Sequence, residues 1–124
     1  MIEAFVKRWD KNNSNLLRSF EEILPSDYKD IVERLVEVVL EDEESSPDHK
    51  RIQQIDHGHY QGTLVYIIAE NGYQPSNYWS VKISYGSCSG CDTFERIIGG
   101  NDKKAMAKDF WNLSLHILQN IKEI

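Results

Sequence analysis

The fold is indicated most directly by TLVYIIAENGYQPSNYWSVKISYG, residues 63–86, in which a polar loop separates two runs of apolar and aromatic residues. The second run alternates strictly from residue 78 onward, and one face of it carries Trp79, Val81, Ile83 and Tyr85. This period of two predicts a strand with one buried face. The first run, residues 63–70, is apolar at nearly every position. That pattern is typical of a central strand covered on both faces.

On the N-terminal side of this stretch, RIQQIDHGHY at residues 51–60 predicts a third strand, because Gln61–Gly62 supplies a turn before the next run. Three consecutive strands with short connections predict an antiparallel meander over about 51–86. Apolar residues at helical spacing occur before and after it, over residues 2–24, after the cap candidates Ser26 and Asp27, and from Asp102 onward. We therefore predict a single α+β domain over residues 1–124, with the meander packed against N-terminal and C-terminal helices.

The sequence leaves one helix open and predicts another. The polar segment DKNNSN, residues 10–15, interrupts the first apolar pattern, so residues 2–24 form either one helix or two turns broken near Asn12–Asn15. Asp92 and Glu95 have the spacing of a capping box, which predicts a short helix over residues 92–98.

The charge of the chain is concentrated in one segment. Residues 25–50 carry three basic and nine acidic side chains, which accounts for the whole net charge of −6. Such a surface repels nucleic-acid phosphates and attracts a basic partner, so we predict no nucleic-acid binding. Glu33, Glu37 and Glu41 repeat every four residues along the second helix. This stripe is either a solvated face or a surface that docks on a basic host protein.

No apolar run approaches the roughly 20 residues that cross a bilayer, and MIEAFVKRWDKNN at the N-terminus lacks a signal-peptide core. We therefore expect a cytoplasmic protein with no membrane partner. In a reducing cytoplasm, Cys88 and Cys91 are expected to be free thiols or metal ligands rather than a disulfide. The sequence leaves the oligomeric state open, including a homo-oligomer.

The meander places the two most unusual motifs of the chain at one edge of the sheet. The first and third strands of a meander end together, so DHGHY at residues 56–60 should lie near CSGC at residues 88–91. His57, Cys88 and Cys91 then form a candidate zinc site, and zinc is the one cofactor that the sequence suggests. The alternative is that the cysteines are small buried residues and the histidines are partly exposed strand-end residues.

Two other interpretations of the same edge remain open. A Cys-x-x-Cys pair at a helix start has a lowered thiol pKa, which would suit a thiol enzyme, but Asp92 beside the pair and the lack of a βαβ context disfavour it. Alternatively, the loop amides around Gly86 and Gly90 could hold an anion. We predict no catalytic residues, because the chain has no P-loop lysine, no Gly-x-Ser-x-Gly and no His-Glu-x-x-His motif. The predicted ligand-binding residues are Asp56, His57, His59, Tyr78, Tyr85, Gly86, Ser87, Gly90, Asp92 and Thr93.

The segment from Ile55 to Ile97 resembles a family of small, mostly uncharacterised bacteriophage proteins. The matching pieces are DHG, YQGTL, YQPSNYW and YGSCSGCDT, and the segment that contains them covers about a third of the chain. In that family the position of His59 is acidic. This counts against a zinc site in which His59 joins His57 as a second histidine ligand. The resemblance implies a phage protein made in the cytoplasm of a bacterial host, and it implies no reaction.

These observations predict a non-enzymatic phage accessory protein. It would sequester a small anionic, for example nucleotide-like, ligand at the sheet edge, or mask a component of host defence. One alternative is a structural zinc module that uses Cys88, Cys91 and His57. Another is a thiol-dependent enzyme.

Overall fold

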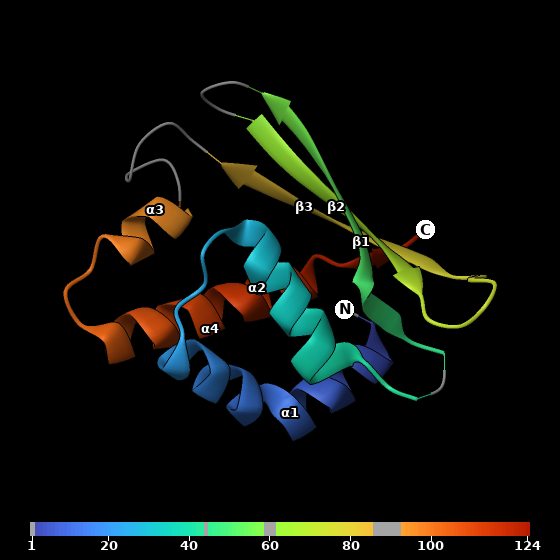
Figure 1. The fold of residues 1–124 in the computed structure, drawn as a ribbon, viewed down its shortest axis with the longest axis horizontal. Helices are drawn as coiled ribbons and strands as arrows, with labels where there is room; N and C mark the ends of the chain where they lie inside the picture. The colour runs from blue at the N-terminus through green and yellow to red at the C-terminus, as the bar shows by residue number, and fades with distance from the viewer. Residues whose placement is uncertain (1, 44, 59–61, 86–92) are drawn as a thin grey trace.

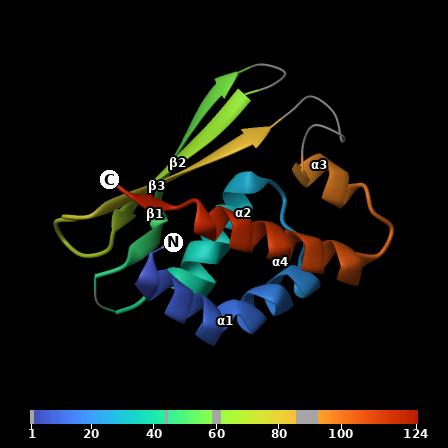
Figure 2. The same cartoon turned by 180° about the vertical axis from the view of Figure 1, so that it is seen from behind.

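The computed structural model describes residues 2–43, 45–58, 62–85 and 93–124. Its elements are, in chain order, α1 (Glu3–Glu22), α2 (Tyr28–Arg34), the π-helical segment η1 (Leu35–Leu40), β1 (Pro47–Gly58), β2 (Gly62–Glu70), β3 (Tyr78–Tyr85), α3 (Thr93–Ile98), α4 (Lys103–Gln119) and β4 (Lys122–Glu123). The α+β class is confirmed. Figure 1 shows two layers, with the helices gathered on one side of a twisted sheet, and Figure 2 shows the same division from behind.

The sheet has four antiparallel strands in the order β1-β2-β3-β4, so the prediction of three strands was incomplete. The strand missed is β4, in which Lys122 and Glu123 pair with Ser80 and Trp79. The backbone N–H of Ile124 also donates to the carbonyl of Tyr78 at 2.9 Å. A strand of two residues directly after a helix is too short to produce a period of two, so its sequence carries no strand signal.

The core lies between the sheet and the helices. In β2 the buried side chains are Leu64, Tyr66, Ile68 and Glu70, and the residues between them are only half-buried. β2 is therefore central, as predicted, but the prediction that both of its faces are covered is wrong. The apolar residues on its outer face, such as Val65 and Ile67, lie on the side of the sheet away from the helices.

The N-terminal region forms one continuous helix, which settles the alternative left open by DKNNSN. The polar residues of this segment bind neighbouring elements. The Asn12 side chain donates to the carbonyl of Val39 in η1 at 3.2 Å. The indole N–H of Trp111 in α4 donates to the carbonyl of Asn13 at 3.0 Å. Asn12 through its side chain and Asn13 through its backbone carbonyl therefore join α1 to η1 and α4, while the Asn13 side chain donates to the carbonyl of Trp9 within α1.

The second helix begins where the cap residues predicted it. The Asp27 carboxylate accepts the backbone N–H of Asp30 at 2.7 Å, the arrangement of an N-cap. After Arg34 the helix widens into η1, whose buried side chains are Leu35, Val36, Val39 and Leu40. The wide turn ends with the backbone N–H of Glu41 donating to the carbonyl of Val36 at 2.8 Å.

Within the described part of the chain, no helix combines the length and apolar character needed to cross a membrane. The two strand ends that the meander was predicted to bring together do meet. Gly62 pairs with Gly58 of β1 on one side and with Tyr85 of β3 on the other. The ends of β1 and β3 therefore flank the start of β2 at a single edge.

Candidate functional site

A cleft of about 310 Å³ lies beside this edge, between the ends of β1 and β3 and the starts of α2 and α3. We call it the strand-end cleft. Its described lining residues are Ser26, Asp27, Tyr28, Gln54, Asp56, Leu64, Tyr66, Tyr85, Phe94 and Glu95. Segments from five places in the sequence thus meet around one hollow.

The sheet side of the cleft is held by two tyrosine hydroxyls. The Tyr85 hydroxyl on β3 donates to Asp56 Oδ1 on β1 at 2.6 Å, across the intervening strand β2. The Tyr66 hydroxyl on β2 donates to Gln54 Oε1 on β1 at 2.8 Å. Both tyrosines lie on the face of the sheet that the helices cover. Both hydroxyls are therefore anchored to side chains of β1.

The helix side is held by contacts between the two helix starts. The backbone N–H of Phe94 in α3 donates to the hydroxyl of Tyr28 in α2 at 3.0 Å. The rings of Tyr28 and Phe94 are 5.4 Å apart between centroids, and Phe94 continues inward to Phe110, 5.0 Å away. The wall of the cleft is thus continuous with the aromatic core.

The electrostatic character of the cleft is negative. The charged side chains among its described lining residues are Asp27, Asp56 and Glu95. Burial raises the pKa of the Tyr66 hydroxyl, and the nearby charges of Asp27 and Asp56 raise it further. The hydrogen bond to Asp56 raises the pKa of Tyr85. Both hydroxyls therefore stay protonated at neutral pH.

Of the predicted ligand-binding residues, the structure brings Asp56 and Tyr85 together in the cleft. Thr93 begins α3 next to Phe94 but lines a separate groove between α3 and α4. Tyr78 does not reach this edge, because it starts β3 and Tyr85 ends it, and so Tyr78 lies at the opposite end of the strand, 41% exposed. The prediction that Tyr78 belongs to the ligand site at this edge is corrected accordingly.

The remaining predicted residues lie outside the described part of the chain, except for the backbone of His57. His57 pairs with Thr63 in the β1–β2 ladder, but its side chain is not among those described. His59, Gly86, Ser87, Cys88, Gly90, Cys91 and Asp92 fall in residues 59–61 and 86–92, which are likewise not described. The zinc site of Cys88, Cys91 and His57 and the anion site of the loop amides therefore stay predictions.

Of the ten described lining residues, sequence reasoning assigned Asp56 and Tyr85 to the site and missed eight, namely Ser26, Asp27, Tyr28, Gln54, Leu64, Tyr66, Phe94 and Glu95. Tyr66 shares a strand face with Leu64 and Ile68, a pattern that indicates a core position. Tyr28 and Phe94 each lie at or one residue inside a helix start, Tyr28 directly after a cap residue. A position at a helix start does not show which way a ring faces, so the sequence carried no signal that these two rings would line the cleft.

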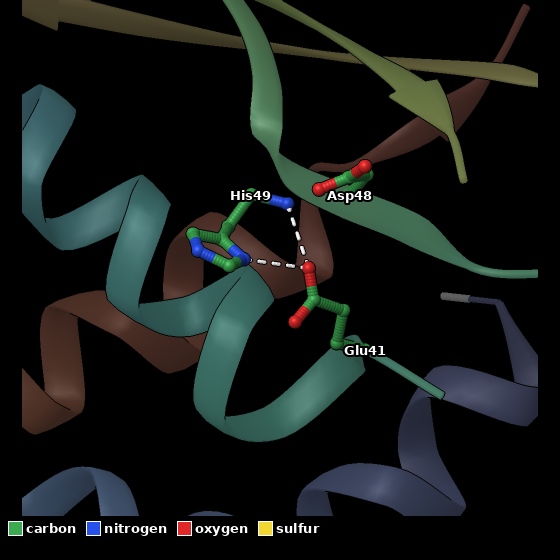
Figure 3. Close-up of side chains that lie close together, drawn as sticks. All are labelled: Glu41, Asp48 and His49. Atoms are coloured by element: carbon green, nitrogen blue, oxygen red, sulfur yellow. Dashed lines mark hydrogen bonds and ion pairs between the residues drawn. The ribbon is translucent and has the colours of Figure 1, made fainter. Parts of the chain in front are cut away.

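A second group of side chains lies at the other end of the helix layer, where η1 leads into β1. Figure 3 shows Glu41, Asp48 and His49, whose potential metal-binding atoms lie within 4.8 Å of one another. Each of them already has partners in the protein. Glu41 Oε1 accepts from the backbone N–H of His49 at 3.0 Å and lies 2.6 Å from His49 Nδ1. Asp48 accepts the backbone N–H of Lys50 at 2.9 Å and pairs with Arg51 at 3.4 Å.

The predicted acidic stripe, Glu33, Glu37 and Glu41, takes part in these and similar contacts. Glu41 and Glu37 both point to His49, the latter at 3.7 Å from Nε2. Glu33 pairs with Lys29 at 3.9 Å. The stripe is therefore partly used inside the protein, where it ties η1 to the first residues of β1.

The chain matches no protein-family model, no curated protein and no solved structure. The geometry of the strand-end cleft therefore carries the functional conclusion.

Proposed function

We propose that this chain is a small phage accessory protein that binds a small ligand in the strand-end cleft and holds it without converting it. The observation that supports this most is the meeting of Asp56 and Tyr85 beside a hollow of about 310 Å³. That volume is at the lower end of the range for small-molecule sites. Sequestration in the cytoplasm of a bacterial host would fit both the resemblance and the size of the cleft.

Binding without reaction is supported by the chemistry of the walls. The described lining residues offer hydroxyl, amide and carboxylate groups, and no cysteine, histidine or lysine is among them. The raised pKa values of Tyr66 and Tyr85 leave both hydroxyls poorly suited to exchange protons near neutral pH. These groups can orient a ligand by hydrogen bonds and ring contacts.

A thermal-shift screen of nucleotides, cyclic dinucleotides, amino acids and amines tests the proposal. A ligand at 100 times its Kd stabilises the folded state by about 2.7 kcal/mol. Ser26→Trp places a bulky side chain at the exposed mouth of the cleft and should abolish the shift. Glu37→Ala, far from the cleft in η1, should leave it intact. A shift lost in Glu37→Ala and kept in Ser26→Trp would contradict the proposal.

A second candidate function is the masking of a basic host protein. It is favoured by a wide hollow of about 550 Å³ whose acidic lining residues are Glu37, Glu41, Asp42, Glu43 and Asp48. The reversed outcome of the same screen, together with salt-sensitive binding of a basic partner that Glu37→Lys abolishes, would support it.

The two alternative functions from the sequence, a zinc module and a thiol enzyme, can both be tested on one preparation of purified protein. About one zinc per chain, released by chelator together with two newly reactive thiols, would support a site at Cys88 and Cys91. A turnover abolished by Cys91→Ser would support the enzyme.

A further inference from the structure

We infer that the strand-end cleft takes a small organic cation, an amine, amidine or guanidinium group carried on a flat or apolar body. This inference rests on the proposed function and names the class of ligand. It departs from the anionic ligand that the sequence predicted.

The first support is the sign of the charge. Among the described residues that line the cleft, every charged one is a carboxylate, namely Asp27, Asp56 and Glu95. The nearest basic residues on α2 have acidic partners of their own. Arg34 forms an ion pair with Asp30 at 2.9 Å, and Lys29 lies 3.9 Å from Glu33. An anion entering the cleft would therefore meet like charges without a compensating cation from α2.

The second support is the use of the hydrogen-bond donors. An anion needs free N–H or O–H groups, and helix starts usually supply them. Here the backbone N–H of Ser26 donates to Asp30 at 3.0 Å, and that of Asp30 donates to Asp27 at 2.7 Å. The N–H of Phe94 donates to the Tyr28 hydroxyl. These donors at the starts of α2 and α3 are already committed within the protein.

The hydroxyl donors on the sheet side are committed as well, to Gln54 and Asp56. Acceptor capacity remains. The part of the chain that the structure describes records one hydrogen bond to the Asp56 carboxylate, at Oδ1, and Asp56 is an exposed residue. A carboxylate has about four lone-pair sites. A ligand that donates hydrogen bonds and carries positive charge therefore meets groups that can accept them.

The third support is the aromatic lining. The rings of Tyr28, Tyr66, Tyr85 and Phe94 line a cleft of about 310 Å³. Aromatic faces attract cations, most strongly where water is partly excluded. Carboxylates beside aromatic rings are a combination that favours ammonium and guanidinium groups over neutral ones. The raised pKa of Tyr66, due first to burial and then to Asp27 and Asp56, reports the same negative field.

The test uses three flat probes of nearly equal size and different charge: benzamidine, benzamide and benzoate. Binding is followed by NMR titration of the amide and ring signals of the cleft residues. Benzamidine should bind at least about tenfold more tightly than benzamide, because a hydrogen bond to a charged group exceeds a neutral one by about that factor. Benzoate should shift none of these signals. Added salt should weaken benzamidine binding and leave benzamide unchanged.

Three variants locate the effect. Asp56→Asn keeps an acceptor for Tyr85 and removes the charge, so it should weaken benzamidine about tenfold while benzamide binding is unchanged. Glu95→Gln makes the same test at the opposite wall if Asp56→Asn does not fold. The matched control is Glu3→Gln, an exposed carboxylate at the start of α1 that lines neither hollow, which should change neither affinity.

Two outcomes overturn the inference and leave the proposed function standing. One is equal binding of all three probes that Ser26→Trp abolishes, and the other is a preference for benzoate. If no probe shifts a cleft signal, the inference also falls, and the broader ligand screen then decides the binding role of the cleft separately.

Discussion

At the level of single residues, Glu70 connects two separate segments of the chain by hydrogen bonds. It ends β2 facing the helices and is only 7% exposed. Its carboxylate accepts the hydroxyl of Ser45, the side-chain amide of Asn77 at 2.5 Å, and both the hydroxyl and the N–H of Ser76. Those donors come from the connection before β1 and the one before β3. A buried carboxylate with this many donors is stable only while ionised.

The first prediction is a stability difference that depends on pH. The hydrogen bond from Ser45, followed by that from Asn77, lowers the pKa of Glu70 below its ordinary value of 4.5. Its contribution is therefore fully present above pH 4.5 and is lost as the pH falls through the lower folded-state value. Glu70→Gln should be less stable than the unaltered protein in urea unfolding at neutral pH, and the difference should shrink in acid. Glu43→Gln, at an exposed position, should show no such trend.

The second prediction concerns the buried hydroxyl of Tyr66. Tyr66→Phe removes its hydrogen bond to Gln54 and should lower the free energy of unfolding by about 1 kcal/mol. Tyr73→Phe is the same chemical change at a side chain that is 96% exposed, and it should have no measurable effect. Equal unfolding midpoints for the two variants would show that the hydroxyl of Tyr66 adds nothing to stability.

At the level of helices and strands, the sequence predicted what periodicity can report and missed what depends on distant partners. The alternation of Trp79, Val81 and Ile83 predicted β3 and its buried face, and Asp27 predicted the start of α2. The pattern of β2 could not show that only one face is covered, because Val65 and Ile67 are apolar wherever they point. β4 has no local signal, since it is defined by its pairing with Trp79 and Ser80 of β3.

The same division holds for the candidate site. The meander predicted that Asp56 and the end of β3 would lie at one edge, because strand order alone requires it. Nothing local could place Tyr28 or Phe94 there, since their positions depend on how α2 and α3 pack. The prediction of an anionic ligand came from loop glycines in residues 86–92, whereas the acidic wall comes from elements distant in sequence.

The third prediction belongs to the start of α2. Asp27→Ala removes the N-cap acceptor of the Asp30 N–H and should lower the free energy of unfolding by about 0.5–2 kcal/mol in a urea titration. Asp27→Asn keeps the capping oxygen without the charge and should retain most of the stability. If Asp27→Asn loses as much as Asp27→Ala, charge rather than capping is the source of the effect.

Across the molecule as a whole, one aromatic chain joins the helices to the cleft. Phe110 of α4 is fully buried and contacts Phe20 of α1, with ring centroids 6.4 Å apart. On its other side it contacts Phe94 of α3 at 5.0 Å, and Phe94 contacts Tyr28 at 5.4 Å. The packing of the core therefore fixes the position of one wall of the cleft.

The fourth prediction tests this connection. Phe110→Ala should lower the free energy of unfolding by about 3–5 kcal/mol. Phe110→Leu, which keeps most of the volume, should lower it much less. In NMR spectra of the folded Phe110→Leu protein, the ring signals of Phe94 and Tyr28 should shift, while those of exposed Tyr73 should not. Unchanged ring signals of Phe94 and Tyr28 would show that the packing of Phe110 does not set the position of this wall of the cleft.

The π-helical turn of η1 affects which deletions this region of the chain can tolerate during evolution. A π-helical turn in a helix is rare and often marks a functional position. A π-helical turn holds one residue more than an α-helical turn, so removing one residue from Leu35–Leu40 would restore a narrower coil and leave the residues after it facing nearly the same way. Glu41 would then keep its side of the helix, and with it the hydrogen bond to His49 at the start of β1. Related chains should thus tolerate a single deletion within η1, whereas a deletion in the α-helical residues Tyr28–Arg34 would rotate everything after it by about 100° and turn Glu41 away from His49.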